Sequence, residues 1–336
     1  MAKRTRGVGQ RKFTDMSVGF FSSGSLILHA KDLKAIDDSG DENKELADEC
    51  HIYLILSRPR LSYLTDGFRV EEEATYGVFK YLVEGSERNT EFKLSGKMNP
   101  DLSLSVSAYP HSKMHLSHNG EVVHTIPAHL MSFIADFDNS EITDLEVEYV
   151  GMSYAEGRRS AKDRLLSHST LQTVLADLNH EAPDKEVLLA LFRYAPPRVM
   201  MVFNGRDKTL DADDDRDFMG DLEAVNQNLS KDLQIALIEA GLIKYFQPKY
   251  NDKYKQRFPH PTHVILEELY GVNIAALSVE INSEELNCRM YSPVMRAGYH
   301  HIANFDLHDA EERTSFFNVM NVPEGGSAGK LSGPFY

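Results

Sequence analysis

The sequence predicts an α+β fold in which a small α/β module is combined with β-rich regions on both sides of it. In the first third of the chain, and again near its end, apolar and polar residues alternate between clusters of Gly, Pro, Asn and Asp. This period of two is typical of antiparallel strands. The middle of the chain instead repeats apolar residues at intervals of three and four, which is typical of amphipathic helices. A chain of 336 residues can hold two domains, because single cores usually stop growing near about 250–300 residues.

Composition and pattern divide the chain into five parts. These are a basic flexible tail (1–13), a β-rich domain (14–130), the α/β module with a short antiparallel sheet and flanking helices (131–258), a β-rich C-terminal region (259–321) and a flexible tail (322–336). The first tail has five Lys or Arg residues and little that could build a core, so we expect no fixed structure there. We can assign no chemistry to the first β-rich domain.

The β-rich domain is expected to contain strands near 23–29, 51–56, 76–83 and 102–109. Its clearest turn is Asn119-Gly120, a type I′ hairpin signal that places His118 opposite Glu121 and His115 opposite His124. With His111 on the same face, three imidazoles could bind zinc, but histidines beside a turn are more often solvated polar residues. We therefore prefer the solvated alternative.

The module is expected to begin its helical part at Ala161 and continue to His180. Buried strands should follow at 186–192 and 199–203. Ser230 is a good N-cap for the next helix, which should end before Pro248. Later strands are expected near 274–281, 289–292 and 302–305.

The formal net charge of −15 argues against a surface that coats nucleic acid everywhere. Local charge differs, because the stretch after Glu239 is basic. Its cations are Lys244, Lys249, Lys253, Lys255 and Arg257. The acidic run at 207–221 lacks the spacing of a calcium loop and is read as a solvated loop. Two cysteines, no signal-peptide pattern and no apolar run long enough to cross a bilayer lead us to expect a cytoplasmic protein without a membrane partner.

Three short segments contain residues that could perform chemistry on a phosphate. Glu148-Tyr149-Val150-Gly151 is strand-like, and Arg164 and His168 are four residues apart, so they share one face of a helix. Glu239 lies in an otherwise apolar helix, where an inward carboxylate needs a partner. An arginine fork can bind two phosphate oxygens, and one carboxylate can hold a divalent ion.

These segments together resemble the GIY-YIG nuclease family, which has a Y-[IV]-G strand, a helix with R-x-x-x-H, and a second helix with E-x-x-L-I followed by P-x-x-N. Here Leu242-Ile243, Pro248 and Asn251 follow Glu239 at the family's offsets. The resemblance covers little more than a third of the chain. It implies an endonuclease that hydrolyses phosphodiester bonds in DNA with one Mg²⁺ or Mn²⁺ ion, with RNA left open as a substrate and roles such as restriction or phage defence compatible.

The resemblance also implies a role for each site residue. Glu239 would be the metal ligand, Arg164 would neutralise the scissile phosphate, and Tyr149 and His168 would activate or orient the attacking water. Substrate-binding residues would be Gly151, Tyr154, Arg158, Lys244, Lys249 and Asn251. The β-rich regions would then supply sequence recognition, or contact a protein partner or a second copy of the chain.

One element of the family is not found where it is expected. A Gly-Ile-Tyr strand should lie about eleven residues before Tyr149, but residues 132–138 contain no tyrosine, and Phe137 or Phe133 would take that place. The base would then be Tyr149, His168 or a water activated by the metal. This gap motivates a second hypothesis, a catalytically degenerate module that binds nucleic acid or supports assembly. A third is a β-domain that binds sugar or protein.

Overall fold

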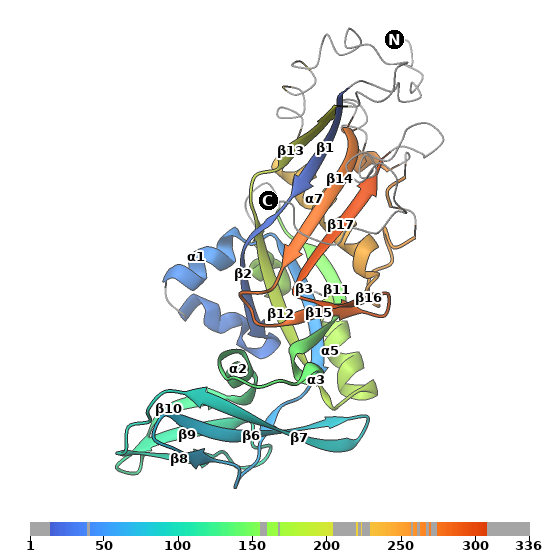
Figure 1. The fold of residues 1–336 in the computed structure, drawn as a ribbon. Coiled ribbons are helices and arrows are strands. Elements are labelled where there is room, and N and C mark those ends of the chain that lie inside the picture. Colours follow the sequence, from blue (N-terminus) through green and yellow to red (C-terminus); the bar gives the residue numbers. More distant parts are fainter. Residues whose placement is uncertain are drawn as a thin grey trace, which may run out of the picture.

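The computed structural model has an α+β fold, as the sequence predicts (Figure 1). It describes residues 14–38, 41–154, 160–166, 169–203, 220, 223, 229–256, 258–260, 263–266, 269 and 274–307. Outside these residues lie both expected tails and the acidic run, of which only Gly220 is described. The same holds for three single residues: Arg158, His168 and Arg257. Within the described part, no helix combines the length and apolarity needed to cross a bilayer.

A six-stranded sheet forms the middle of the molecule, with the order β16-β15-β11-β3-β12-β2. Its strands are β2 (Ser22–His29), β3 (Ile52–Pro59), β11 (Asp144–Met152), β12 (Lys185–Tyr194), β15 (Arg289–Ser292) and β16 (Met295–Gly298). β3 pairs antiparallel with both β11 and β12. Strand β3 is buried along almost its whole length, which explains its continuous apolar sequence rather than an alternating one.

Helices cover both faces of this sheet. One face packs, through Tyr53 and Ile55 of β3, against η1 (Ala30–Asp38), α1 (Asp41–Glu49), α4 (Ala161–Leu166) and α5 (Ser169–Glu181). The other face packs, through Leu54 and Leu56, against α7 (Lys231–Phe246). The expected cap is confirmed, because the Ser230 side chain accepts a hydrogen bond from the Leu233 amide.

A second sheet extends the core beyond α7, with the order β13-β1-β14-β17. Its strands are β1 (Thr14–Phe20), β13 (Arg198–Phe203), β14 (Ile274–Asn282) and β17 (His300–Asp306). Helix α7 contacts β14 and β17, and the short η3 (Val264–Leu266) lies beside α7. The expected strands at 199–203, 274–281 and 302–305 are therefore confirmed, in a sheet separate from the one that holds Tyr149.

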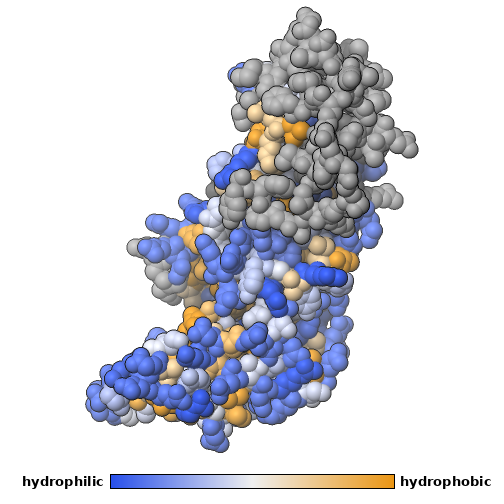
Figure 2. All heavy atoms as spheres, in the orientation of Figure 1, coloured by the Kyte–Doolittle hydropathy of each residue, from blue (hydrophilic) through white to orange (hydrophobic). Residues whose placement is uncertain are grey.

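Residues 60–143 form an insertion between β3 and β11, at the lower end of Figure 1. One sheet contains β4 (Ser62–Tyr63), β5 (Arg69–Val70), β6 (Ala74–Val83) and β7 (Ser86–Ser95), and another contains β8 (Leu102–Val106), β9 (Lys113–His118) and β10 (Glu121–Pro127). Helices α2 (Ala128–Ile134) and α3 (Ser140–Thr143) lead back to β11. The insertion has its own apolar core, and mostly hydrophilic side chains cover its visible face (Figure 2).

The strand expected at 132–138 is not formed. Helix α2 continues to Ile134, and Phe137 packs on the insertion's core with its ring edge on Phe79, at a centroid distance of 5.6 Å. Neither Phe133 nor Phe137 is therefore placed beside Tyr149. Within α2, Ala128 and Met131 pack into the insertion's core, whereas Phe133 packs against the main core beside the Arg58 guanidinium.

The Asn119-Gly120 turn is confirmed, because both residues have positive φ, 52° and 84°, and His118 pairs with Glu121. The expected pairing of His115 with His124 is wrong. The register shifts between Val122 and His124, so that His115 pairs with Thr125. A one-residue shift turns the following side chains to the other face, which separates the expected zinc histidines. Within the described residues, no group of three or more His, Cys, Asp and Glu side chains is placed to hold an ion.

Candidate active site

Tyr53 and Tyr149 lie beside each other on the neighbouring strands β3 and β11. Tyr53 pairs with Gly151, and an irregularity between Val147 and Tyr149 aligns Tyr149 with Ile55. The two ring centroids are 6.1 Å apart, and the phenols are hydrogen-bonded to each other. Tyr53 is 1% exposed, whereas Tyr149 is half-buried.

Gly151 makes this arrangement of the tyrosines possible. A Cβ at this position would lie 2.5 Å from Cζ and Oη of Tyr53 and 2.6 Å from Cε1 of Tyr149. These distances are far below van der Waals contact, so any larger residue would displace at least one ring. Gly151 therefore has a packing role, because it permits the close approach of both rings to the backbone of β11.

Arg164 reaches the tyrosine pair from α4. Its guanidinium donates a hydrogen bond to the Tyr53 hydroxyl, and its charge also acts on Tyr149 and Glu239. The start of α4 is fixed, because the Ser160 amide and hydroxyl bond to the Asp163 carboxylate and the Ala161 amide donates to the Cys50 carbonyl. Arg164 itself is exposed, so the guanidinium can hold Tyr53 and still meet a phosphate that arrives from solvent.

Glu239 joins the site from α7, on the other side of β11. Its half-buried carboxylate accepts a hydrogen bond from the Met152 amide at the end of that strand. Burial raises the pKa of Glu239 to about 7, although the Met152 hydrogen bond and the charges of Lys253 and Arg164 act in the opposite direction. A carboxyl group with this pKa is protonated much of the time near neutral pH unless a cation binds to it.

Both tyrosine hydroxyls keep their protons at neutral pH. Burial, and then the charge of the other site groups, raises the pKa of Tyr53 and the pKa of Tyr149. Arg164 opposes both shifts. An unaided phenol in this site is therefore a hydrogen-bonding group, and it needs a further cation nearby before it can take a proton.

Of the four expected catalytic residues, the structure brings Tyr149, Arg164 and Glu239 together, and His168 lies outside the described residues. Tyr53 was missed. Its strand was expected in the first β-rich domain because it lies 96 positions before Tyr149 (149 − 53 = 96). The available signal was His51-Ile52-Tyr53, which matches the last two letters of the Gly-Ile-Tyr motif.

Asn251 supports the backbone of the site. Its amide oxygen accepts from the Val150 amide at 2.9 Å, and its amide nitrogen donates to the Val150 carbonyl at 2.8 Å. The residue is 5% exposed. Asn251 thus completes the hydrogen bonds of β11 at Val150, on the side where none of the described strands pairs with that residue.

We expect Asn251→Ala to lower the free energy of unfolding by about 2–4 kcal/mol, because it leaves two buried backbone groups unpaired. Urea unfolding of the full chain would measure this loss. Asn99→Ala is a control, since the Asn99 side chain bonds only to the exposed Asp101 amide. An equal small effect of both substitutions would contradict the structural role of Asn251.

Three more of the expected substrate-binding residues, Tyr154, Lys244 and Lys249, lie in the described part of the chain. Lys244 donates to the Gln256 carbonyl at 3.2 Å, and Lys249 forms an exposed ion pair with Glu181 at 3.2 Å. Tyr154 is half-buried, with its ring edge-on to His51 at 5.1 Å. Lys253 is exposed, and its positive charge acts to lower the pKa of Glu239. The basic stretch after Glu239 therefore extends to the site.

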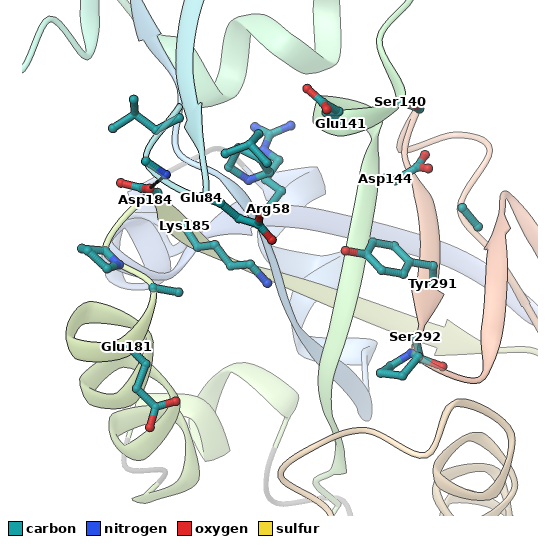
Figure 3. A pocket seen from close by; sticks show the side chains of 18 of the residues that line it. Arg58, Glu84, Ser140, Glu141, Asp144, Glu181, Asp184, Lys185, Tyr291 and Ser292 are labelled. Carbon is teal, nitrogen blue, oxygen red and sulfur yellow. Dashed lines mark hydrogen bonds between the residues drawn. The ribbon is translucent and has the colours of Figure 1, made fainter. Parts of the chain in front are cut away.

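A larger cleft of about 1000 Å³ lies at the opposite end of β3 (Figure 3). Two of the three lysine and arginine residues in its described walls form ion pairs within the protein: Arg58 pairs with Glu186, and Lys185 pairs with Glu146 at 2.7 Å. Arg58 also donates to Ile142, His129 and Ser132, which ties the insertion to the sheet. The lining also has five acidic residues, Glu84, Glu141, Asp144, Glu181 and Asp184, which disfavour the binding of a phosphate, and the tyrosine site lies about 20 Å away along the strand.

Among the described residues of the site, Glu239 is a carboxylate that could hold one hard divalent cation. Magnesium usually keeps several waters and binds through one or two carboxylates together with substrate phosphate oxygens. Glu239 supplies such a carboxylate, and burial away from water raises the pKa of this group. The bound ion would polarise phosphate oxygens and favour the ionised form of the carboxylate.

No protein-family model matches the chain, and neither a curated protein nor a solved structure matches it significantly.

Proposed function

We propose that this protein is a divalent-metal-dependent endonuclease that hydrolyses phosphodiester bonds in DNA, with a module that resembles the GIY-YIG nucleases. The observation that carries the proposal is the meeting of Tyr53, Tyr149, Arg164 and Glu239 at one end of the β3/β11 pair. Tyr53 takes the place of the tyrosine that the family pattern requires. The insertion separates the two tyrosine strands in sequence but leaves them paired in space.

The role that we assign to each residue follows from how far its side chain is exposed. Arg164 is exposed and would neutralise the phosphate as negative charge builds on it. Glu239 would hold Mg²⁺ or Mn²⁺. Tyr149 is half-buried and would orient the attacking water, whereas the buried Tyr53 would position Arg164 and Tyr149.

The proposed setting is the cytoplasm, in restriction or phage defence, with DNA as the partner and RNA as the alternative substrate. The competing function is a degenerate module that binds nucleic acid without cleaving it. The raised pKa of both phenols in the metal-free protein favours that alternative, so the deciding test is turnover.

We expect the full chain to nick supercoiled plasmid with Mg²⁺ or Mn²⁺ and to stop when EDTA is added. Arg164→Ala should lower the rate about 100-fold, as for the loss of one donor to a developing oxyanion, and lower stability by only about 1 kcal/mol because Arg164 is exposed. Arg193→Ala is the control, since Arg193 is a partly exposed arginine on β12 of the same sheet and pairs with Glu49. Tight binding of plasmid without nicking would instead establish the degenerate function.

A further inference from the structure

A second, smaller hollow of about 380 Å³ lies directly beside Glu239. Its described walls are Met152, Ser153, Tyr154, Ser230, Asp232, Leu233, Ala236 and Ile265. Pockets that hold small ligands usually occupy roughly 300–1,000 Å³. The hollow is therefore large enough for one planar group and too small for a folded partner.

Two connections place this hollow next to the site. Met152, whose amide donates to Glu239, is also one of the walls. Ala236 precedes Glu239 by three residues on α7, which is a rise of about 4.5 Å, and Leu233 lies one turn further. A group that occupies the hollow would be separated from a phosphate at Glu239 by about the length of one nucleotide.

The chemistry of the walls suits a nucleobase. Tyr154 offers an aromatic ring, which makes an edge contact with His51, and Leu233 and Ala236 contribute apolar surface to the walls. Stacking on an aromatic ring is how proteins hold an unstacked base of any sequence. The polar edge comes from Ser153, Ser230 and Asp232, and a carboxylate accepts from the exocyclic amine of cytosine, adenine or guanine.

We propose that this hollow receives the base of the nucleotide next to the scissile phosphate, turned out of the helical stack, with a preference for bases that have an exocyclic amine. The inference rests on the proposed nuclease function, since it assumes that a phosphate binds at Glu239. It assigns to Tyr154, Leu233 and Ala236 a part in substrate selection. Unpaired or mismatched positions would be the preferred places of cutting, because turning out such a base costs least.

The test uses the full chain and a set of DNA duplexes of one sequence, each with a single abasic site at a different position. Wild-type protein should cleave about 10-fold more slowly when the abasic site falls at one position beside the cut, as for the loss of one stacked base. Ala236→Phe, which fills the hollow, should cleave intact DNA about 10-fold more slowly and should lose the sensitivity to that position. Ala176→Phe makes the same change at an exposed residue of α5 and should behave as wild type.

Equal sensitivity of wild type and Ala236→Phe to the abasic position, or an unchanged rate of Ala236→Phe on intact DNA, would overturn the base site while leaving the nuclease function intact. If wild type cleaves no DNA, the nuclease proposal fails. The base site can then still be tested by measuring the dissociation constants of Glu239→Gln for the same duplexes. A uniform affinity across the set would contradict the base site. If Ala236→Phe does not fold, Tyr154→Leu removes the stacking ring and gives the same comparison.

Discussion

Glu239→Gln is expected to lower the nicking rate by at least about 10³ and, at the same time, to stabilise the folded protein above pH 7. The rate falls because a neutral amide is a poor ligand for Mg²⁺, and loss of the ion removes several kcal/mol of charge stabilisation. Excess Mg²⁺ should not restore activity. A variant that nicks at the wild-type rate would remove Glu239 from the mechanism.

The gain in stability follows from the raised pKa of the carboxyl. Burial lifts the pKa of Glu239 from its ordinary 4.5 to about 7, so between these values the folded state binds a proton that the unfolded state has lost. Stability therefore falls as pH rises through this window, and the penalty is complete above pH 7, at about 3 kcal/mol. Glutamine has no charge and avoids the penalty.

Urea unfolding without metal at pH 5 and pH 8 measures this effect. The stability difference between Glu239→Gln and wild type should be small at pH 5 and should favour the variant at pH 8. Glu181→Gln provides the control, because the Glu181 side chain is 61% exposed and should show little dependence on pH. If Glu239→Gln is the less stable protein at pH 8, the carboxylate is solvated and the proposed ion site is not buried.

Much of the fold can be predicted from local sequence. The N-cap Ser230, the apolar stripe after it and Pro248 predict α7 to within a residue or two. The buried strand β12 follows from its apolar run. These signals are reliable because the interactions that cause them lie within a few residues of one another.

Tyr53 could not be predicted in the same way, because its partnership with Tyr149 is formed across the insertion. A turn that joins two antiparallel strands keeps their ends close together, and here Ser57 still pairs with Glu146 beside the insertion. Such a position can take a folded domain with closely spaced ends at little cost in loop entropy. The two tyrosine strands are thus paired in space, although a pattern limited to neighbouring residues does not predict this pairing.

The predicted pairing of His115 with His124 is wrong for a different reason. Counting outward from Asn119-Gly120 assumes an uninterrupted ladder, but the register shifts between Val122 and His124. Val122 and Val123 are each 57% exposed, so no buried face fixes the register at that point. Where neither face of a strand is buried, the sequence contains little information about an irregularity.

The two tyrosines should respond differently to loss of the hydroxyl. Tyr149 is half-buried beside Glu239, so its hydroxyl can meet the attacking water, and Tyr149→Phe should lower the nicking rate about 10³-fold, within the range for a lost proton-transfer or water-orienting group. Tyr53 is 1% exposed and bonds to Arg164. Its hydroxyl acts through other residues, so Tyr53→Phe should lower the nicking rate only about 10-fold. The effect on the rate should be larger than the effect on DNA affinity.

Tyr63→Phe separates these effects from a general loss of stability. Tyr63 is also 1% exposed, and its hydroxyl donates to the Ile126 carbonyl at 3.2 Å within the insertion. All three substitutions keep the ring and should each lower stability by about 1 kcal/mol, measured by urea unfolding, but Tyr63→Phe should nick DNA at the wild-type rate. A greater loss of turnover for Tyr53→Phe than for Tyr149→Phe would reverse the assignment, and would mean that the binding of DNA opens the site far enough to bring the buried phenol to the phosphate.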